Sequence, residues 1–450
     1  METFNVTVEN LGPIRSARFA ASHFNILCGK NNSGKSMCIH TVFCFLSKWR
    51  GRIHLSEGDN LANELVQKTR VKIEALSFVE KINPVLESSS KDFSAHLYEY
   101  LNRSPGQLRD CEVIFQMNPD YIRNRLECCS INVFLSITPT SKMILRKAPH
   151  STEASFSIEN SGGGEFPEMG LVKRAANRLL DYLLIESVLP RPYLMTAERS
   201  GSILYGDDLR TRAFLERGAQ SEKIGNPSED ERYAYPYVEE LHCIWMAQSN
   251  LPVKPSEPGK TSLPDDVRRV FDRTVALGAY NGHDGKIYYQ PSDEAREFRL
   301  NEVSTSVRAL MQLNDFVNRS MREQNLLLMM DEPELNLHPE RQRALARFLV
   351  LLMKHRGVGV VLSTHSDYIV KEINTLLMFG SQEPAVKDVM REHCYQEDEF
   401  LNLGDVACGI TENHTITPVR PDASDGLILP VFDSTIEEMN VIQDEIRWRA

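Results

Sequence analysis

Eight residues near the N-terminus, Gly29 to Ser36, have the types and spacing needed to bind a polyphosphate. They read GKNNSGKS, the pattern G-x-x-x-x-G-K-S of a phosphate-binding loop. Backbone N–H groups of such a loop surround phosphate oxygens, the lysine adds positive charge at the outer phosphates, and the serine hydroxyl can ligate Mg²⁺. The sequence therefore predicts a nucleotide site with these binding residues: Gly29, Asn31, Asn32, Ser33, Gly34, Lys35 and Ser36.

A second group with catalytic chemistry follows an apolar run at 326–330. Asp331 and Glu332 come directly after that run. A buried strand ending in two acids places both carboxylates at the C-terminal edge of a parallel sheet, where α/β proteins bind ligands. There Asp331 would hold Mg²⁺ through a water, and Glu332 would polarise the attacking water. The alternative is a core strand followed by an acidic helix cap, since Pro333 and Glu334 also form a typical helix start.

A third polar strand end lies one predicted helix further along the chain. The β-branched segment 358–362 leads into Ser363, Thr364 and His365. An imidazole there can donate to a γ-phosphate or orient a water, although a lone histidine is more often structural. Because neighbouring strands end at the same sheet edge, we predict His365 near the paired acids. Glu332 and His365 are thus the candidate catalytic residues, and Ser36 and Asp331 the candidate metal ligands.

The elements that must position these residues can be read from apolar periodicity. A short strand at 24–28 leads into the phosphate loop, and a helix at 37–46 leads out of it, as the motif requires. Further along, the pattern predicts a mostly helical region at 58–104 and a helix at 168–189. Between them, it predicts strands at 111–117, 131–137, 143–146 and 156–158.

The remaining segments have weaker signals. Residues 200–265 are rich in Gly, Pro, Ser and charge, with Tyr233, Tyr235 and Tyr237 embedded, and they indicate an inserted lid or partner surface. A packed turn is the alternative for the tyrosines. A closing helix is expected from about Ser434 to Arg449.

Composition limits the class of protein. The 450 residues carry 42% hydrophobic and 25% charged residues, which is ordinary for a folded chain of two or three lobes. No apolar stretch approaches the roughly 20 residues of a membrane helix, and no leader pattern begins the chain. The nine cysteines lack paired zinc spacing. We therefore expect a cytoplasmic protein without membrane association.

The net charge of −11 argues against a nucleic-acid surface over the whole chain. It leaves room for a local groove. Two small basic clusters could form one, although solvated faces are the simpler interpretation; the clusters are Lys142, Arg146 and Lys147, and Lys173, Arg174 and Arg178.

Taken together, the motifs G-x-N-x-S-G-K-S, D-E-P-E, L-N-L-H-P and S-T-H-S resemble those of the ABC-type ATPases of the SMC, RecF and OLD group. The opening at 6–14 and the segment from Tyr193 to Gly201 are also similar to that group. Within it, the chain is most similar to AAA-annotated ATPases of bacterial anti-phage systems such as Septu, PARIS and Gabija. The resemblance covers residues 1–50 and 300–380 well and the middle of the chain poorly.

The resemblance implies an α/β fold with an ABC-type, RecF-like nucleotide-binding lobe built on a mixed sheet. That lobe would comprise residues 1–50 and 286–380. Residues 51–285 would form an inserted helical and β arm or lid, and 381–450 a C-terminal extension. The insertion lacks sustained heptads, so no long coiled coil is expected.

The resemblance also implies a mechanism in which a homodimer or higher oligomer sandwiches ATP and Mg²⁺ between subunits. A signature loop from the other subunit would complete each site, and here Ser304 is the candidate that acts in trans. Thr305 and Ser306 stand where glycines are usual, which puts fast turnover in doubt. An ordinary serine-capped helix is the competing interpretation. Asn336 to His338 occupy the position of the group's inter-subunit loop.

As a biological role, the resemblance implies a sensor or regulator of a separate effector protein, a nuclease, in anti-phage defence. A nucleic acid or a phage protein would be the trigger. No nuclease motif set is readable after the histidine strand, where only 381–450 remain. A RecF-like DNA-repair ATPase that clamps DNA and an ATP-binding scaffold with little turnover are the two alternatives.

Overall fold

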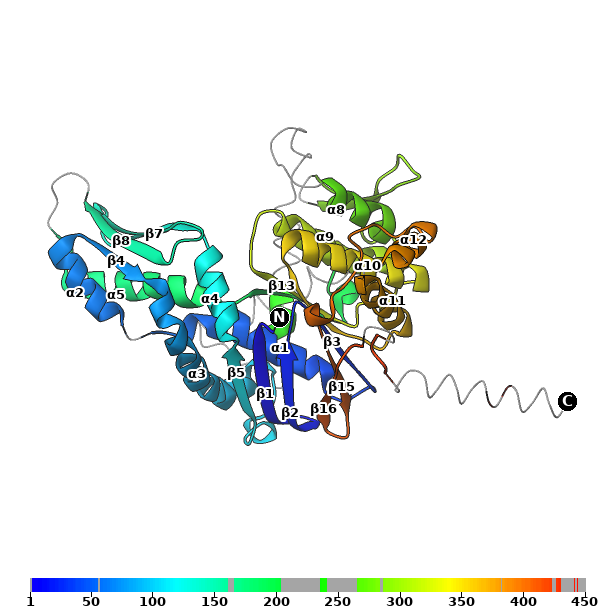
Figure 1. The fold of residues 1–450 in the computed structure, drawn as a ribbon, viewed down its shortest axis with the longest axis horizontal. Helices are drawn as coiled ribbons and strands as arrows, with labels where there is room; N and C mark the ends of the chain where they lie inside the picture. Colours follow the sequence, from blue (N-terminus) through cyan, green and yellow to red (C-terminus); the bar gives the residue numbers. More distant parts are fainter. Residues whose placement is uncertain are drawn as a thin grey trace, which may run out of the picture.

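The protein is described here from a computed structural model. Its described residues are 2–55, 57–160, 166–203, 235–240, 265–283, 286–381, 383–422, 426–429, 441 and 443. The predicted closing helix at 434–449 and most of the predicted insertion at 200–265 lie outside these residues. Figure 1 shows an arm that extends from a larger lobe.

The larger lobe is built on a six-stranded mixed sheet, which confirms the predicted α/β class. Its strand order is β16-β15-β3-β14-β13-β9. The first pair is antiparallel and the four other pairs are parallel. The strands are β3 (Phe24–Gly29), β9 (Arg191–Met195), β13 (Leu326–Asp331), β14 (Gly359–Ser363), β15 (Val406–Glu412) and β16 (Thr415–Val419).

Layers on both faces bury this sheet. Alternate residues of β13 face opposite sides, so Leu327 and Met329 join one core and Leu328 and Met330 join the other. The first core includes helix α1 (Lys35–Ser47), and a three-stranded sheet of β1 (Phe4–Leu11), β2 (Ile14–Ala21) and β5 (Glu112–Met117). The second includes α9 (Thr305–Ser320), α10 (Pro339–Arg356) and α11 (Asp367–Met378), which lie together in Figure 1. Burial on both faces explains why the central strands read as continuous apolar runs.

The arm combines helices with a four-stranded antiparallel sheet of order β4-β8-β7-β6. In Figure 1 it occupies the left side of the molecule. Its strands are β4 (Arg70–Glu74), β6 (Ile131–Ser136), β7 (Ser141–Lys147) and β8 (Glu153–Asn160). Its helices are α2 (Gly58–Lys68), α3 (Val79–Tyr100), α4 (Pro119–Cys128) and α5 (Met169–Asp181).

Smaller elements complete the lobe. A three-stranded sheet contains β10 (Gly278–His283), β11 (Lys286–Pro291) and β12 (Phe298–Arg299). Two further helices are α8 (Asp265–Val270) and α12 (Pro384–Glu392). Within the described ranges, every helix is too short or too polar to cross a bilayer.

The structure confirms most of the predicted element pattern and adds two elements to it. The region 58–104 is mostly helical, as predicted, but it also contains strand β4, whose Val71 and Ile73 alternate with polar residues and pair with β8. Strands at 112–117, 131–136, 141–147 and 153–160 confirm the four predicted strands, and helix α4 lies in the gap between the first two of them. There Asn118 caps the helix by accepting a hydrogen bond from the Asp120 N–H (2.9 Å), and Pro119 occupies the first turn.

The central sheet also draws on more of the chain than the predicted lobe. Strand β9 lies within residues assigned to the arm, and β15 and β16 lie within those assigned to the C-terminal extension.

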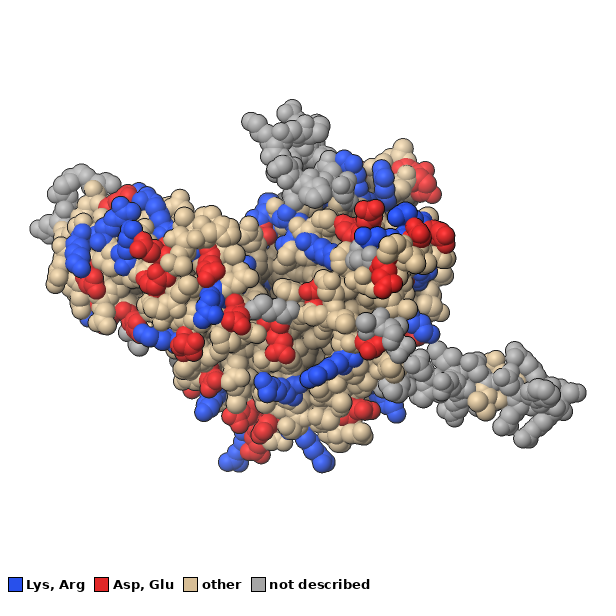
Figure 2. Space-filling model, viewed as in Figure 1, with Lys and Arg blue, Asp and Glu red and all other residues tan. Residues whose placement is uncertain are grey.

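Acidic partners accompany both of the basic clusters noted in the sequence. Lys142 and Arg146 pair with Glu159 at 3.2 and 3.5 Å, and Lys173 pairs with Asp59 at 3.0 Å. Figure 2 shows basic and acidic side chains interspersed over this face of the arm. These contacts favour the interpretation of each cluster as a solvated face.

Candidate functional site

The loop between β3 and α1 has a backbone that requires glycine at two positions. Gly29 and Gly34 have φ values of 139° and 101°. A Cβ on Gly29 would lie 2.4 Å from the carbonyl oxygen of Thr411, so no larger residue fits. No side chain caps the N-terminus of α1, which leaves its first N–H groups available to an anion.

Lys35 is held over this loop by its own backbone. Its Nζ donates to the carbonyl oxygens of Gly29 (3.0 Å) and Lys30 (2.9 Å), and the residue is 5% exposed. Burial lowers the pKa of Lys35, and the nearby Glu332 and Asp331 carboxylates oppose that shift. The ammonium therefore has a fixed position beside the cradle of N–H groups.

Asp331 and Ser36 meet across the sheet edge, although 295 positions separate them in the chain. The Ser36 hydroxyl donates to Asp331 Oδ1 at 3.0 Å, and the Ser363 hydroxyl donates to the same oxygen. The parallel register of β13 and β14 pairs Asp331 with Ser363, which aligns these strand ends. A hydroxyl and a carboxylate are oxygen ligands of the kind that Mg²⁺ prefers, so the residues fit this ion.

Glu332 follows in a strained turn. Its φ is 48°, and its N–H donates to the backbone oxygen (3.1 Å) and the hydroxyl oxygen (3.2 Å) of Ser363. Burial raises the pKa of its carboxyl, and the negative charges of Asp331 and Glu334 add to the shift. A carboxylate with a raised pKa is suited to accept a proton from water.

Arg199 fixes the backbone of this turn, a role that the sequence did not reveal. Its guanidinium donates to four carbonyl oxygens, and the residue is 2% exposed. The acceptors are Thr196 (3.0 Å), Asp331 (3.1 Å), Glu332 (3.0 Å) and Pro333 (3.2 Å). Its segment follows β9 at the same sheet edge, which is the signal that could have identified it.

His365 lies at the end of β14, with Nε2 3.8 Å from Glu332 Oε1. Burial lowers the pKa of His365, and the positive charge of Lys35 lowers it further. Glu334 holds the strand end, since it accepts hydrogen bonds from the His365 N–H (2.5 Å) and the Thr364 hydroxyl (2.9 Å). The alternative that Pro333 and Glu334 start a helix is wrong, because they lie in a turn and α10 begins at Pro339.

A cavity of about 830 Å³ joins these groups. The loop residues 31–36 line one side, and Glu332, Glu334 and His365 line another. Arg103 from the arm and Tyr237 also line it. The volume falls in the range of small-molecule sites, roughly 300–1,000 Å³.

His40 is a further lining residue that the sequence analysis did not select. It is 7% exposed, its Nε2 lies 3.7 Å from Asp331 Oδ2, and its ring meets the Tyr237 ring edge-on at 5.6 Å. Burial lowers the pKa of the imidazole, and Asp331 opposes the shift. The sequence signal was its spacing of four residues from Ser36 on one helix.

Ser304 lies away from this cavity. It caps α9, where its hydroxyl accepts from the Val307 N–H at 3.4 Å and contacts the Ser306 hydroxyl at 2.8 Å. The side chain is exposed. Of the predicted inter-subunit loop, Asn336 has a φ of 64° and Leu337 is buried. The geometry of one subunit leaves both assignments as proposals.

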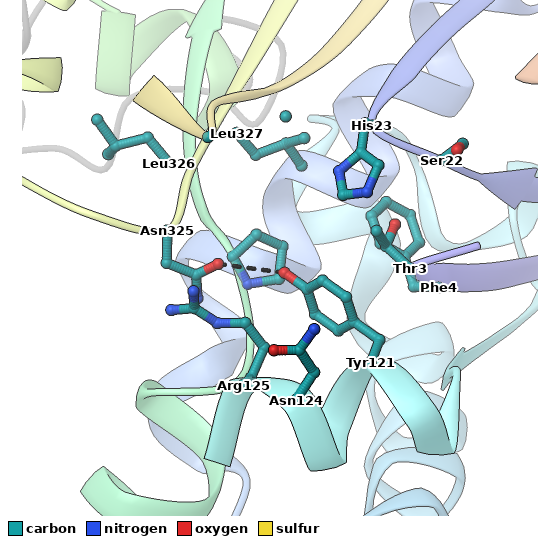
Figure 3. A pocket seen from close by; sticks show the side chains of 13 residues that line it. Thr3, Phe4, Ser22, His23, Tyr121, Asn124, Arg125, Asn325, Leu326 and Leu327 are labelled. Carbon is teal, nitrogen blue, oxygen red and sulfur yellow. Dashed lines mark hydrogen bonds between the residues drawn. The ribbon is translucent and has the colours of Figure 1, made fainter. Parts of the chain in front are cut away.

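A second cavity, of about 230 Å³, lies at the opposite end of the central strands, against α4 of the arm. Figure 3 shows Tyr121, Asn124 and Arg125 of α4 facing Asn325, the residue before β13. The Tyr121 hydroxyl donates to Asn325 Oδ1 (3.3 Å), and Asn325 Nδ2 donates to the carbonyl oxygens of residues 187 to 189. Arg125 also donates to the carbonyl oxygen of Ser187 (3.3 Å). These bonds tie the arm to the start of β13.

One comparison with known proteins covers part of the lining of the first cavity. Residues 247–370, less than half of the chain, match the family model described as an AAA ATPase domain. That stretch contains Asp331, Glu332 and His365. No curated protein sequence matches the chain.

Several solved structures are similar at low scores. The Smc head bound to the C-winged helix domain of ScpA has 9% identity and a TM-score of 0.35, over 92% of this chain and 96% of that one. The Smc head with an extended coiled coil, bound to the C-terminal domain of ScpA derived from Pyrococcus furiosus, has 10% identity and a TM-score of 0.35, over 99% of this chain and 100% of that one. The SMC head domain from Thermotoga maritima has 10% identity and a TM-score of 0.32, over 94% of this chain and 100% of that one. These scores are too low to carry an argument. The chain is thus a mixed α/β protein in which residues 247–370 are similar to an AAA ATPase domain.

Proposed function

We propose that this protein is an ABC-type ATPase that binds ATP with Mg²⁺ and hydrolyses it. One observation carries the proposal: loop residues 31–36, Glu332 and His365 line one cavity, and the loop residue Ser36 contacts Asp331 at 3.0 Å. These groups come from three distant parts of the chain, and each has the chemistry that phosphoryl transfer needs.

Each residue has a role in this proposal. Lys35 and the loop N–H groups bind the outer phosphates, and Ser36 and Asp331 hold Mg²⁺. When bound, Mg²⁺ supplies neutralisation of the phosphate charge. Glu332 accepts a proton from the attacking water on its carboxylate. His365, whose pKa is lowered, orients that water or contacts the γ-phosphate as a neutral imidazole.

We further propose that ATP closes a homodimer, in which Ser304 of each subunit completes the site of its partner. The exposed position of Ser304 at the N-terminus of α9 supports this role, since helix N-termini bind phosphate. The absence of the usual glycines at Thr305 and Ser306 favours slow turnover, which also keeps the alternative of an ATP-binding scaffold.

The resemblance of the motifs supports a sensor or regulatory role in anti-phage defence. In this role the protein controls a separate effector nuclease, in response to a nucleic acid or a phage protein. Co-purification with the product of a neighbouring gene would support this part, and DNA binding that weakens with salt would instead favour the RecF-like alternative.

The central test measures ATP binding and phosphate release separately in the full chain. Lys35→Ala should weaken binding of a fluorescent ATP analogue at least about tenfold, because it removes a charge-assisted contact. Glu332→Gln should retain binding and lose about a hundredfold or more in kcat. Binding that is equal in Lys35→Ala and the parent would refute the nucleotide site. A parent as slow as Glu332→Gln would leave the scaffold function instead.

A further inference from the structure

His40 and Ser36 share one face of α1 and contact the same carboxylate. They are four residues apart, so their side chains lie one above the other on the helix. Ser36 Oγ donates to Asp331 Oδ1 at 3.0 Å, while His40 Nε2 lies 3.7 Å from Asp331 Oδ2. The imidazole therefore flanks the position where Ser36 and Asp331 would hold a cation.

The Nε2 atom of His40 is buried, and it has no hydrogen-bond partner among the described residues. Its ring lines the nucleotide cavity, and Tyr237 packs edge-on against it. A buried polar atom without a partner is unfavourable, and native proteins rarely keep one without a reason. A bound cation would satisfy this nitrogen.

The three side chains lie around one possible cation position. Two adjacent ligands in an octahedron with bonds of about 2.1 Å lie about 3.0 Å apart. The distance of 3.0 Å between Ser36 Oγ and Asp331 Oδ1 equals this edge, whereas His40 Nε2 lies 3.7 Å from the other carboxylate oxygen, Oδ2. The His40 side chain must therefore move toward the cation before its nitrogen becomes a ligand.

We propose that His40 Nε2 ligates the divalent cation of the nucleotide site, together with Ser36 and Asp331. The site would then take a first-row transition ion, such as Mn²⁺, in preference to Mg²⁺. The reason is that Mg²⁺ strongly favours oxygen ligands, whereas an imidazole nitrogen raises the affinity for transition ions. This inference rests on the proposed ATP site and replaces the Mg²⁺ proposed there with a transition ion as the preferred metal.

Pulsed electron paramagnetic resonance of Mn²⁺ tests the His40 ligand and the proposed nucleotide site separately. The sample is the full chain carrying Glu332→Gln, which prevents turnover, with Mn²⁺ and ATP, and gel filtration removes the unbound Mn²⁺–ATP before measurement. Coupling to ³¹P reports a phosphate beside the metal, and coupling to ¹⁴N reports an imidazole ligand. We expect both couplings, with the nitrogen signal changed by ¹⁵N-histidine labelling. It should be lost in His40→Gln and kept in His365→Gln, the matched control from the same cavity.

The outcomes separate the two claims. A ³¹P coupling without a histidine coupling, or a histidine signal that disappears with His365 instead, would overturn the His40 assignment and leave the ATPase proposal intact. The absence of ³¹P coupling would count against the nucleotide site itself. A ¹⁵N-sensitive signal in the Glu332→Gln chain that is kept in His365→Gln identifies His40 as the ligand among the two histidines that line this cavity, so the test does not depend on the folding of His40→Gln.

Metal competition gives a second measurement. In calorimetric titrations with ATP, the parent should bind Mn²⁺ at least about tenfold more tightly than Mg²⁺, the scale on which metal sites respond to changes at their ligands. His40→Gln should lose most of this preference by weakening Mn²⁺ binding. An equal preference in the parent and in His40→Gln would refute the proposal.

Discussion

Replacing Arg199 should separate the geometry of the acidic turn from nucleotide binding. Its guanidinium donates four hydrogen bonds to backbone oxygens, three of them in the turn from Asp331 to Pro333. The phosphate loop is not among its acceptors. The change should therefore disturb the position of Glu332 more than the cradle around the phosphates.

The size of the effect follows from these contacts. At about 1 kcal/mol for each net hydrogen bond, Arg199→Met should lower the free energy of unfolding by about 4 kcal/mol. Arg199→Lys keeps a charge but has three donors without the planar fork, so it should retain about half of the bonds and lose about 2 kcal/mol. Arg123→Met is a suitable control, because Arg123 is exposed, pairs with Asp120 at 3.1 Å and should change stability by less than about 1 kcal/mol.

Urea denaturation, ATP affinity and kcat should be measured on all three variants. We expect Arg199→Lys to fold, to bind ATP within a few-fold of the parent, and to lose at least about tenfold in kcat, since small displacements of catalytic groups are costly. If Arg199→Lys matches the Arg123 control in both stability and kcat, Arg199 does not support the turn and the reasoning is refuted.

Three further predictions concern the same site. The pKa of Glu332 is raised, so activity, which needs its carboxylate, should fall as the pH drops below a midpoint higher than that of an ordinary glutamate. Glu334→Gln removes a nearby negative charge and should move this midpoint in the kcat–pH profile to lower pH. An unmoved midpoint would contradict the assignment of Glu332 as the proton acceptor. Gly29→Ala should abolish ATP binding in a fluorescence titration because its Cβ has no space, whereas Gly106→Ala, with nothing within 4 Å, should bind normally; equal binding would contradict the loop geometry. Ser304→Arg should prevent the ATP-dependent dimer in light scattering without weakening nucleotide binding to the monomer, and a dimer that still forms would remove Ser304 from the interface.

The sequence predicted the parts of the site that are local in the chain. The loop from Gly29 to Ser36 is expected to bind through its own backbone, so its chemistry can be read without the fold. Asp331 and His365 could be placed together because both follow strands separated by one helix, and such strands end at one sheet edge. In the structure Asp331 Oδ1 lies 3.0 Å from Ser36 Oγ, and His365 lines the cavity together with residues 31–36 of the loop.

What the sequence missed depends on contacts between distant segments. Arg199 donates to backbone carbonyl oxygens, which no residue type in the sequence can indicate. In the sequence, His40 is an ordinary polar residue of a helix, and only the fold brings Asp331 beside it. Strand β9 is short and contains Pro192, so only its pairing with β13 identifies it as part of the central sheet. Strand β4 was not predicted for a related reason, since five residues are too few to distinguish strand alternation from helical periodicity.

Strand β13 runs between a contact with the arm and the acidic turn. Directly before the strand, the Asn325 side chain donates to the carbonyl oxygens of Ser187 and Leu189 and accepts a hydrogen bond from Tyr121. Its last residue, Asp331, contacts Ser36 of the phosphate loop. Six extended residues span about 20 Å and do not stretch. We therefore expect a displacement of α4 either to break the contacts at Asn325 or to move the carboxylate of Asp331, so that β13 couples the arm to the proposed nucleotide site.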